Sequence, residues 1–132
     1  MPRQKKPLLT CLNVAVANGI GTTINVEEYN NIAIQLGIPT GSTLVVKAMA
    51  SNSEEAPNFA AAQSLDNHFD YIQLIDLEDG STIDGDTGIP VTASLEFRNL
   101  VVNTANIKWI NFVVSGFTAG SATVKVLPVD NS

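Results

Sequence analysis

Side chains able to serve as nucleophile and base are scarce in this sequence, which contains one cysteine, Cys11, and one histidine, His68. Nucleophilic catalysis at neutral pH needs a thiol or hydroxyl beside a base whose pKa lies near 7. Cys11 stands among apolar residues, where a buried thiol acts as a small hydrophobic side chain. His68 lies in a polar run from Asp66 to Asp70, which favours a solvated or turn-capping imidazole over a catalytic one. We therefore expect no catalytic residues and no enzyme activity.

Acidic side chains gather between positions 76 and 86, where they form the best candidate for a cation site. Calcium binds about six to eight oxygen atoms, which carboxylates and loop carbonyls supply. The residues to test first are Asp79, Asp84 and Asp86. Their spacing does not match the EF-hand loop, and Asp-Gly pairs are also turn sequences in which the aspartate caps its own backbone. We therefore expect neither a bound metal nor another cofactor.

The composition describes a single compact domain that has few charged side chains. The chain has 132 residues, of which 45% are hydrophobic and only 15% are charged, against about 25% charged in average soluble proteins. A chain so poor in charge tends to associate with other proteins. One cysteine cannot form an intrachain disulfide, and no continuous apolar stretch predicts a signal peptide or a membrane span. We expect no membrane partner.

The basic residues are distributed unevenly along the chain. Three of the seven, Arg3, Lys5 and Lys6, lie within the first six positions, which leaves four basic and thirteen acidic residues in 7–132. This acidic body repels polyanions, because nucleic-acid binding needs clustered lysine and arginine side chains. We therefore expect no nucleic-acid partner. Residues 1–7 are interpreted as a flexible basic N-terminal arm, either a solvated tail or a segment that docks on an acidic neighbour.

Apolar and polar residues alternate with a period of two through most of the chain, which is typical of half-buried strands. The predicted strands are 8–16, 22–26, 31–36, 42–50, 71–77, 95–102, 107–115 and 121–126. Turns rich in glycine, asparagine and aspartate separate them, and no long stretch keeps a helical period. We therefore expect an all-β fold over residues 8–132: a single antiparallel β-sandwich, jelly-roll-like or Ig-like, of about eight strands.

Alternation also predicts which side chains of the strand 107–115 point away from the core. Ile110 and its neighbours two residues away form one face, so Trp109 and Val113 lie on the opposite, outer face. A half-exposed tryptophan beside apolar neighbours is a frequent interface anchor. The alternative is that the N-terminal strand or the long irregular segment 51–70 covers Trp109.

The first strand is expected to make another external contact. Its alternation places one set of side chains on a common face: Leu8, Thr10, Leu12, Val14 and Val16. We expect Leu8 and Leu9, at the start of this strand, to contact a partner protein. The arm residues Arg3, Lys5 and Lys6 are expected to contact the same partner.

Two parts of the chain carry runs of residues that are similar to a known family. Residues 21–37 read GTTINVEEYNNIAIQLG, and residues 105–124 read ANIKWINFVVSGFTAGSATV. The first run resembles the opening of small β-sandwich virion proteins of tailed bacteriophages, roughly S-T-x-V-D-V-x-x-Y-x-N before an alternating strand. The second resembles their strand A-G-L/V-K-Y/F-L/I/V-R-V-x-V-S and closing hairpin x-Y/F-T-S-G-S/T-A-T-V. The chain departs from this family at the long loop, where Glu54, Glu55 and Phe59 replace glycines and a tryptophan.

The resemblance implies a structural virion protein. Its most specific form is a capsid decoration (cement) protein, which binds the major capsid protein on the outer surface of the head and stabilises contacts between capsid subunits. The resemblance then implies a location in the virion after assembly in the host cytoplasm, and a homo-oligomer, with a trimer favoured. Two alternatives are open: a head-fibre or tail structural component, and a carbohydrate-binding module that attaches the particle to a host through Trp109, Phe59 or Tyr71.

Overall fold

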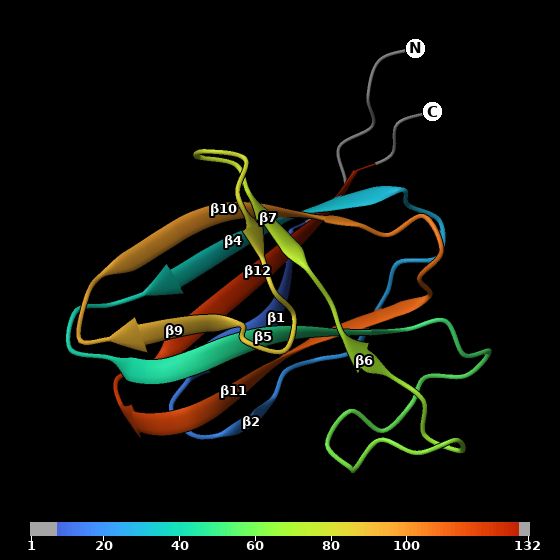
Figure 1. The fold of residues 1–132 in the computed structure, drawn as a ribbon, viewed down its shortest axis with the longest axis horizontal. Coiled ribbons are helices and arrows are strands. Elements are labelled where there is room, and N and C mark those ends of the chain that lie inside the picture. The colour runs from blue at the N-terminus through green and yellow to red at the C-terminus, as the bar shows by residue number, and fades with distance from the viewer. Residues whose placement is uncertain (1–7, 130–132) are drawn as a thin grey trace.

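The computed structural model describes residues 8–129, which form two antiparallel β-sheets packed face to face (Figure 1). The first sheet has the strand order β1-β12-β4-β10-β7-β8. Its strands span, in that order, Leu9–Ala15, Ala122–Val129, Asn31–Ile38, Glu96–Asn103, Leu74–Asp76 and Thr82–Ile83.

The second sheet has the order β2-β11-β5-β6, and two further short strands extend it, because β3 pairs with β11 and β9 pairs with β5. These strands span, in the order named, Gly19–Ile20, Trp109–Ala119, Thr43–Ser51, Asp70–Tyr71, Ile24–Asn25 and Ile89–Thr92. Residues 8–129 contain no helix. The predicted fold class, an antiparallel all-β sandwich, is confirmed.

Most strands that follow one another along the chain lie in opposite sheets, as Figure 1 shows for β4 and β5 and for β11 and β12. The exceptions are the pairs β2 and β3, β5 and β6, and β7 and β8. The row β1-β12-β4-β10 of the first sheet faces a row in which β2 and β3, then β11, β5 and β9 follow one another. This is the strand order of a jelly roll, which is built from two interlocked Greek keys. Of the two predicted sandwich types, the jelly roll is the one that the topology matches.

The structure has twelve strands in residues 8–129, whereas the alternation predicted about eight. The additional strands are segments of two to four residues, too short to show a period of two. The predicted strand 71–77 is also wrong, because the chain changes sheets within it. Asp70–Tyr71 pairs with β5 in the second sheet, and Leu74–Asp76 pairs with β10 in the first.

The core lies between the inner faces of the sheets, where every second side chain of the long strands is buried. In β4, Ile32, Ile34 and Leu36 are buried, and the residues between them are half-buried or exposed. Ile110 and Phe112 of β11 belong to the same hydrophobic cluster. Burying one large apolar side chain contributes roughly 1.5–3 kcal/mol, so this inward row explains why the sequence alternates.

β1 breaks the alternation predicted for it. Cys11 and Leu12 are consecutive in sequence and both are buried. The pairing of β1 with β12 shifts register between Thr10 and Leu12, and again between Leu12 and Ala15. Such a β-bulge takes neighbouring side chains out of their regular order. The predicted common face is therefore wrong, since Leu12 lies in the core while the rest of the set is exposed: Leu8, Thr10, Val14 and Val16.

Candidate interaction surfaces

The N-terminal strand β1 presents exposed aliphatic side chains at the edge of the first sheet. β1 pairs with β12 on one side and with no other strand of residues 8–129 on its other side. The exposed aliphatic side chains of this edge are Leu8, Leu9, Val14 and Val16. An edge strand carries unpaired N–H and C=O groups that can pair with another chain. Leu8 and Leu9 are thus accessible for contact, whereas Arg3, Lys5 and Lys6 lie outside the described residues.

Val14 holds part of this edge in a left-handed backbone conformation, with φ at 51°. Its N–H donates a hydrogen bond of 3.3 Å to Thr123 Oγ1 in β12. A β-branched residue in this region carries a strain of about 1–3 kcal/mol. The exposed side chain gains little packing in return. Strained residues of this kind gather at binding sites, which marks the bulged edge as a candidate contact surface.

A loop, residues 52–69, covers the outer face of the second sheet. Two loop residues, Phe59 and Phe69, form a second buried cluster with Met49 of β5, separate from the core between the sheets. The two phenylalanine rings are tilted against each other, with centroids 5.2 Å apart. The chain's own loop therefore covers much of the outer face of this sheet.

Trp109 and Val113 lie on the outer face of β11 and pack against this second cluster. The loop covers Trp109, whose Nε1 donates a hydrogen bond of 3.0 Å to the carbonyl oxygen of Ser53. Trp109 is half-buried as a result, and Phe59 is buried. The aromatic residues considered for glycan binding thus pack within the protein and do not form an open platform.

Hydrogen bonds fix the loop as far as its tip. The Asn67 side chain donates to two loop carbonyls and accepts from the N–H of Asn58 at 2.7 Å. Ser64 and Asn67 exchange two backbone hydrogen bonds of 3.1 Å each, which closes a tight turn. Leu65 and Asp66 form the tip of that turn, and the Leu65 side chain is 97% exposed. The loop therefore presents a leucine on an ordered support.

The two residues considered for nucleophilic catalysis lie in different parts of the fold. Cys11 Sγ is buried and donates to Thr22 O at 3.3 Å and to Asn111 Oδ1 at 3.4 Å. Burial raises the pKa of the Cys11 thiol to about 11, although backbone hydrogen bonds act in the opposite direction. The reactive thiolate is therefore scarce at neutral pH. His68 is exposed in the loop, where its carbonyl oxygen accepts a 2.6 Å hydrogen bond from Ser51 Oγ.

Asn111 locks β11 to the segment that joins β2 to β3. Its Oδ1 accepts from the Gly21 N–H at 3.0 Å, and its Nδ2 donates to Gly21 O and Thr23 Oγ1 at 3.0 Å each. A side chain at Gly21 would collide with the carbonyl of Cys11, so only glycine fits there. Because the polar groups of this buried amide are all hydrogen-bonded, Asn111 has a structural role. This role explains why a buried polar residue lies between Trp109 and Val113 in the strand.

Asp79 and Asp84, two of the residues considered for a cation site, cap their own turns. Asp79 Oδ1 accepts from the Ser81 N–H at 2.9 Å, and hydrogen bonds from Ser81 hold the pKa of Asp79 below its ordinary value. Asp84 Oδ2 accepts from the N–H and the hydroxyl of Thr87, both at 3.1 Å. Asp86 is exposed. Within residues 8–129, no three histidine, cysteine or acidic side chains gather where they could hold a metal ion.

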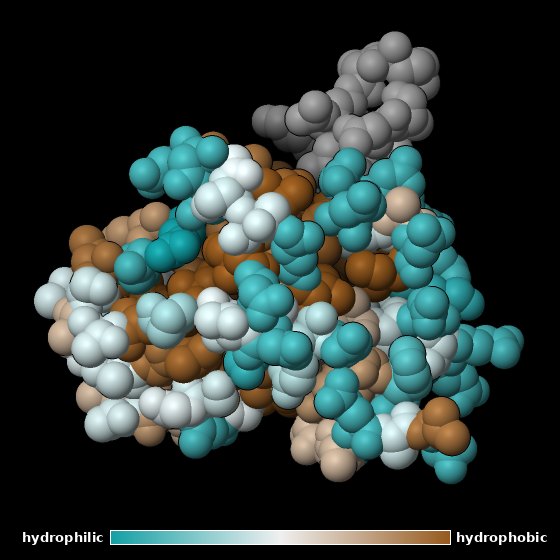
Figure 2. All heavy atoms as spheres, in the orientation of Figure 1, coloured by the Kyte–Doolittle hydropathy of each residue, from teal (hydrophilic) through white to brown (hydrophobic). Residues whose placement is uncertain are grey.

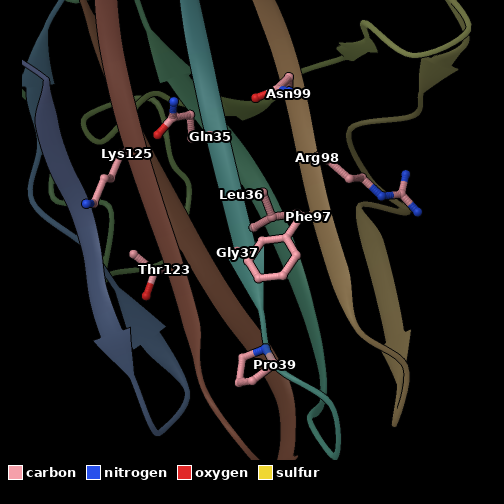
Figure 3. Close-up of a pocket in the computed structure, with 9 residues that line it drawn as sticks. All are labelled: Gln35, Leu36, Gly37, Pro39, Phe97, Arg98, Asn99, Thr123 and Lys125. Carbon is pink, nitrogen blue, oxygen red and sulfur yellow. The ribbon is translucent and has the colours of Figure 1, made fainter.

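An apolar groove of about 430 Å³ crosses the outer face of the first sheet over β12, β4 and β10 (Figure 3). Phe97 of β10 lies over Gly37, its register partner in β4, and is 73% exposed. The glycine leaves room for the ring, because a Cβ at Gly37 would lie 3.3 Å from it. Pro39 extends the apolar lining beyond the end of β4. An exposed ring in such a groove is a typical anchor for a partner.

Two basic residues line this groove, and they differ in their ion pairs. Arg98 is held by Asp76 at 3.4 Å and Glu96 at 3.1 Å, and its guanidinium group points away from the groove (Figure 3). Lys125 makes no ion pair in the described part of the chain. The groove therefore has an exposed aromatic ring on its β10 side. On its β12 side it has a lysine that makes no ion pair within residues 8–129, and the ammonium group of this lysine points away from Phe97 (Figure 3).

Phe97 was not among the predicted contact residues, although the sequence carries a signal for it. In the alternating strand 95–102, Leu100 belongs to the buried face, and Phe97 falls on the opposite face with Asn99. A large apolar residue on a polar face is an indication of external contact. The groove itself could be identified only from the structure, because Lys125 and Gly37, which line it, belong to two other strands.

Hydrophobic residues also reach the surface elsewhere. Figure 2 shows them in the middle of the face viewed, framed by hydrophilic residues on the surrounding loops. In residues 8–129, Leu77 and Leu95 are further exposed leucines. No helix of the described chain has the length and hydropathy needed to cross a membrane.

The comparisons with known proteins bear on the fold. No protein-family model and no curated protein matches this chain. The crystal structure of the SPBc2 prophage-derived protein YomS is similar, with a TM-score of 0.72 over 98% of this chain and 96% of that chain. The sequence identity is 15%. The chain thus shares its β-sandwich fold with a prophage-derived protein.

Proposed function

We propose that this chain is a structural protein of a tailed-phage particle, and specifically a capsid decoration (cement) protein on the outer surface of the head. The observation that carries the proposal is a jelly-roll sandwich with an exposed aliphatic edge, β1, next to a basic stretch of sequence. Jelly rolls recur in viral capsid domains. The likeness to a prophage-derived protein and the virion-protein motifs in residues 21–37 and 105–124 support a phage origin.

The major capsid protein is the proposed partner, and β1 is the proposed docking edge. Apart from the carbonyl oxygen of Cys11, which already accepts from the Thr22 N–H at 2.8 Å, the open side of β1 offers backbone donors and acceptors for pairing with a strand of the shell. Leu8, Leu9 and Val16 add apolar area beside it. A protein that bridges two capsid subunits binds only the assembled shell, so its binding free energy stabilises that shell.

Particles prepared with and without the protein test the cement role. Decorated particles are expected to release their DNA at a higher temperature, which a DNA-binding dye reports during heating. The variant Leu9→Ser, Val16→Ser removes apolar area from β1 and from the residue that follows it, and is expected to lower occupancy on particles. Leu95→Ser removes an exposed leucine outside β1 and serves as the control. Equal release temperatures for decorated and bare particles overturn the cement role.

Copy number distinguishes the cement protein from a head-fibre or tail component. A cement protein sits at repeated positions over the head, so protein staining of purified particles should give a stoichiometry comparable with that of the major capsid protein. A value of only a few copies per particle would favour the fibre or tail role.

A further inference from the structure

We propose that two copies of this chain bind each other through unlike surfaces: the loop tip Leu65-Asp66 of one copy seats in the Phe97 groove of the next. The Phe97 groove is the groove lined by Phe97, Gly37, Pro39 and Lys125. This contact deepens the proposed function, because it names the surface through which particle-bound copies would associate. The inference rests on the proposed function only for the place where the copies meet, which is the surface of a phage particle.

The loop tip has the properties of a preformed knob. Leu65 is almost entirely exposed, although a large apolar side chain gains free energy from burial. The Ser64–Asn67 hydrogen bonds and the Asn67 side chain hold the turn in one shape. A preorganised turn loses little conformational entropy when it binds, so more of the burial free energy appears as affinity.

The Phe97 groove has the complementary shape and chemistry. Its volume of about 430 Å³ is large enough to take a leucine side chain. Phe97 and Pro39 supply apolar walls, and Gly37 leaves room for the Phe97 ring, which lies over it. Within residues 8–129 this is an apolar pocket on the outer face of the first sheet, whereas Leu65 lies on the loop that covers the second sheet.

Charge complementarity selects a second copy as the occupant. Residues 8–129 contain four basic side chains, and three of them are already engaged. Arg98 and Lys108 form ion pairs within the chain, and Lys47 lies 5.0 Å from the centre of the Tyr71 ring. Lys125 makes no ion pair in this part of the chain and lines the groove. Asp66, the exposed residue next to Leu65, brings a negative charge to the same contact.

The knob and the groove lie on different surfaces of one chain, so the contact is heterologous. Each copy then offers a groove to one neighbour and a knob to the other. Such a contact closes into a ring when its rotation permits and otherwise continues as a filament. A closed ring fits the homo-oligomer that the sequence resemblance implies.

Sedimentation velocity of the full chain, without phage particles, tests this contact. The wild-type chain is expected to sediment as an oligomer that dissociates on dilution. Leu65→Ser, Asp66→Lys and Lys125→Glu should each weaken association by about tenfold or more. The double variant Asp66→Lys, Lys125→Glu should recover association, because it restores opposite charges at the contact. Glu28→Lys reverses the charge of an exposed residue that precedes β4, at the other end of that strand from Gly37, and should leave association unchanged.

A monomeric wild-type chain at all concentrations overturns the inference. So does an oligomer that Leu65→Ser and Lys125→Glu leave as stable as the Glu28→Lys control, because the copies would then associate through another surface, such as two Phe97 faces. All changes are at the surface, and thermal unfolding of each variant confirms that it is folded. A chain that forms this contact but does not bind phage heads would overturn the proposed function and leave the inference intact.

Discussion

Cys11 shows how one buried side chain couples acid–base chemistry to stability. Burial raises the pKa of its thiol from 9.0 to about 11 in the folded chain, whereas the unfolded thiol ionises near its ordinary pKa. The neutral, buried thiol therefore contributes its full stability below about pH 9. Between about pH 9 and 11 the thiol ionises in the unfolded state and stays neutral in the folded state, which stabilises the unfolded state. The contribution of about 2–3 kcal/mol is therefore lost over this range.

Replacement of Cys11 by alanine is expected to flatten this part of the stability profile. The Cys11→Ala variant loses some packing at every pH, but its free energy of unfolding should fall less between pH 8 and 11 than that of the wild type. Urea unfolding at a series of pH values measures both curves. All other ionisable groups are the same in both chains, so the difference between the two curves isolates the effect of Cys11. Parallel curves would show that the buried thiol does not govern alkaline stability.

At the scale of the element, β1 is an edge strand whose regular geometry is interrupted. β1 has two register shifts, and Val14 has a left-handed backbone conformation. As a result, consecutive side chains of β1 do not alternate regularly between the core and the solvent. A left-handed conformation costs an L-residue about 1–2 kcal/mol, and glycine adopts it without that strain. The strand therefore keeps a residue that its backbone does not favour.

Val14→Gly is expected to raise the free energy of unfolding by about 0.5–1 kcal/mol, because the relief of strain exceeds the entropic cost of glycine. Val16→Gly is the matched control: Val16 is a similarly exposed valine without a positive φ, and glycine there should lower stability. Urea unfolding midpoints of the two variants give the comparison. If Val14→Gly is as destabilising as Val16→Gly, the left-handed conformation does not persist in solution.

The sequence was sufficient for the long central strands and insufficient for the edges. β4, β5, β10, β11 and β12 each have eight residues or more, and the inward faces of β4 and β10 follow directly from a period of two. The bulges of β1 and the crossing between β6 and β7 depend on which neighbour each residue meets across the sheet. Such tertiary pairing leaves no local pattern of residues.

The candidate contact residues divide in the same way. Alternation placed Trp109 and Val113 on the outer face of β11, but only the structure shows that the loop 52–69 covers them. The outward position of Phe97 could be predicted from the alternation of its own strand. The groove around it could not be predicted, because Gly37 and Lys125 come from strands that are far from Phe97 in sequence.

At the scale of the whole molecule, charge is separated between the start of the chain and its body. Residues 8–129 contain twelve acidic and four basic side chains, whereas the first six positions contain three basic residues and no acidic one. An acidic body with a basic N-terminal stretch favours docking on an acidic surface through that stretch. Attractions between exposed charges are screened within about 8–10 Å at physiological ionic strength, so such docking should weaken as salt is added.

The variant Arg3→Gln, Lys5→Gln, Lys6→Gln is expected to occupy fewer sites on phage heads at low salt, and to lose less of its binding as salt rises. The wild type, which has the three charges, should show the steeper salt dependence. Occupancy on purified particles across a salt series, measured by protein staining, gives both slopes. The control variant Arg3→Lys, Lys5→Arg, Lys6→Arg exchanges arginine and lysine at these positions. It keeps the three positive charges and should keep the wild-type dependence of occupancy on salt. If neutralising all three residues changes neither occupancy nor slope, the N-terminal charges take no part in attachment, and docking rests on the apolar edge of β1 alone.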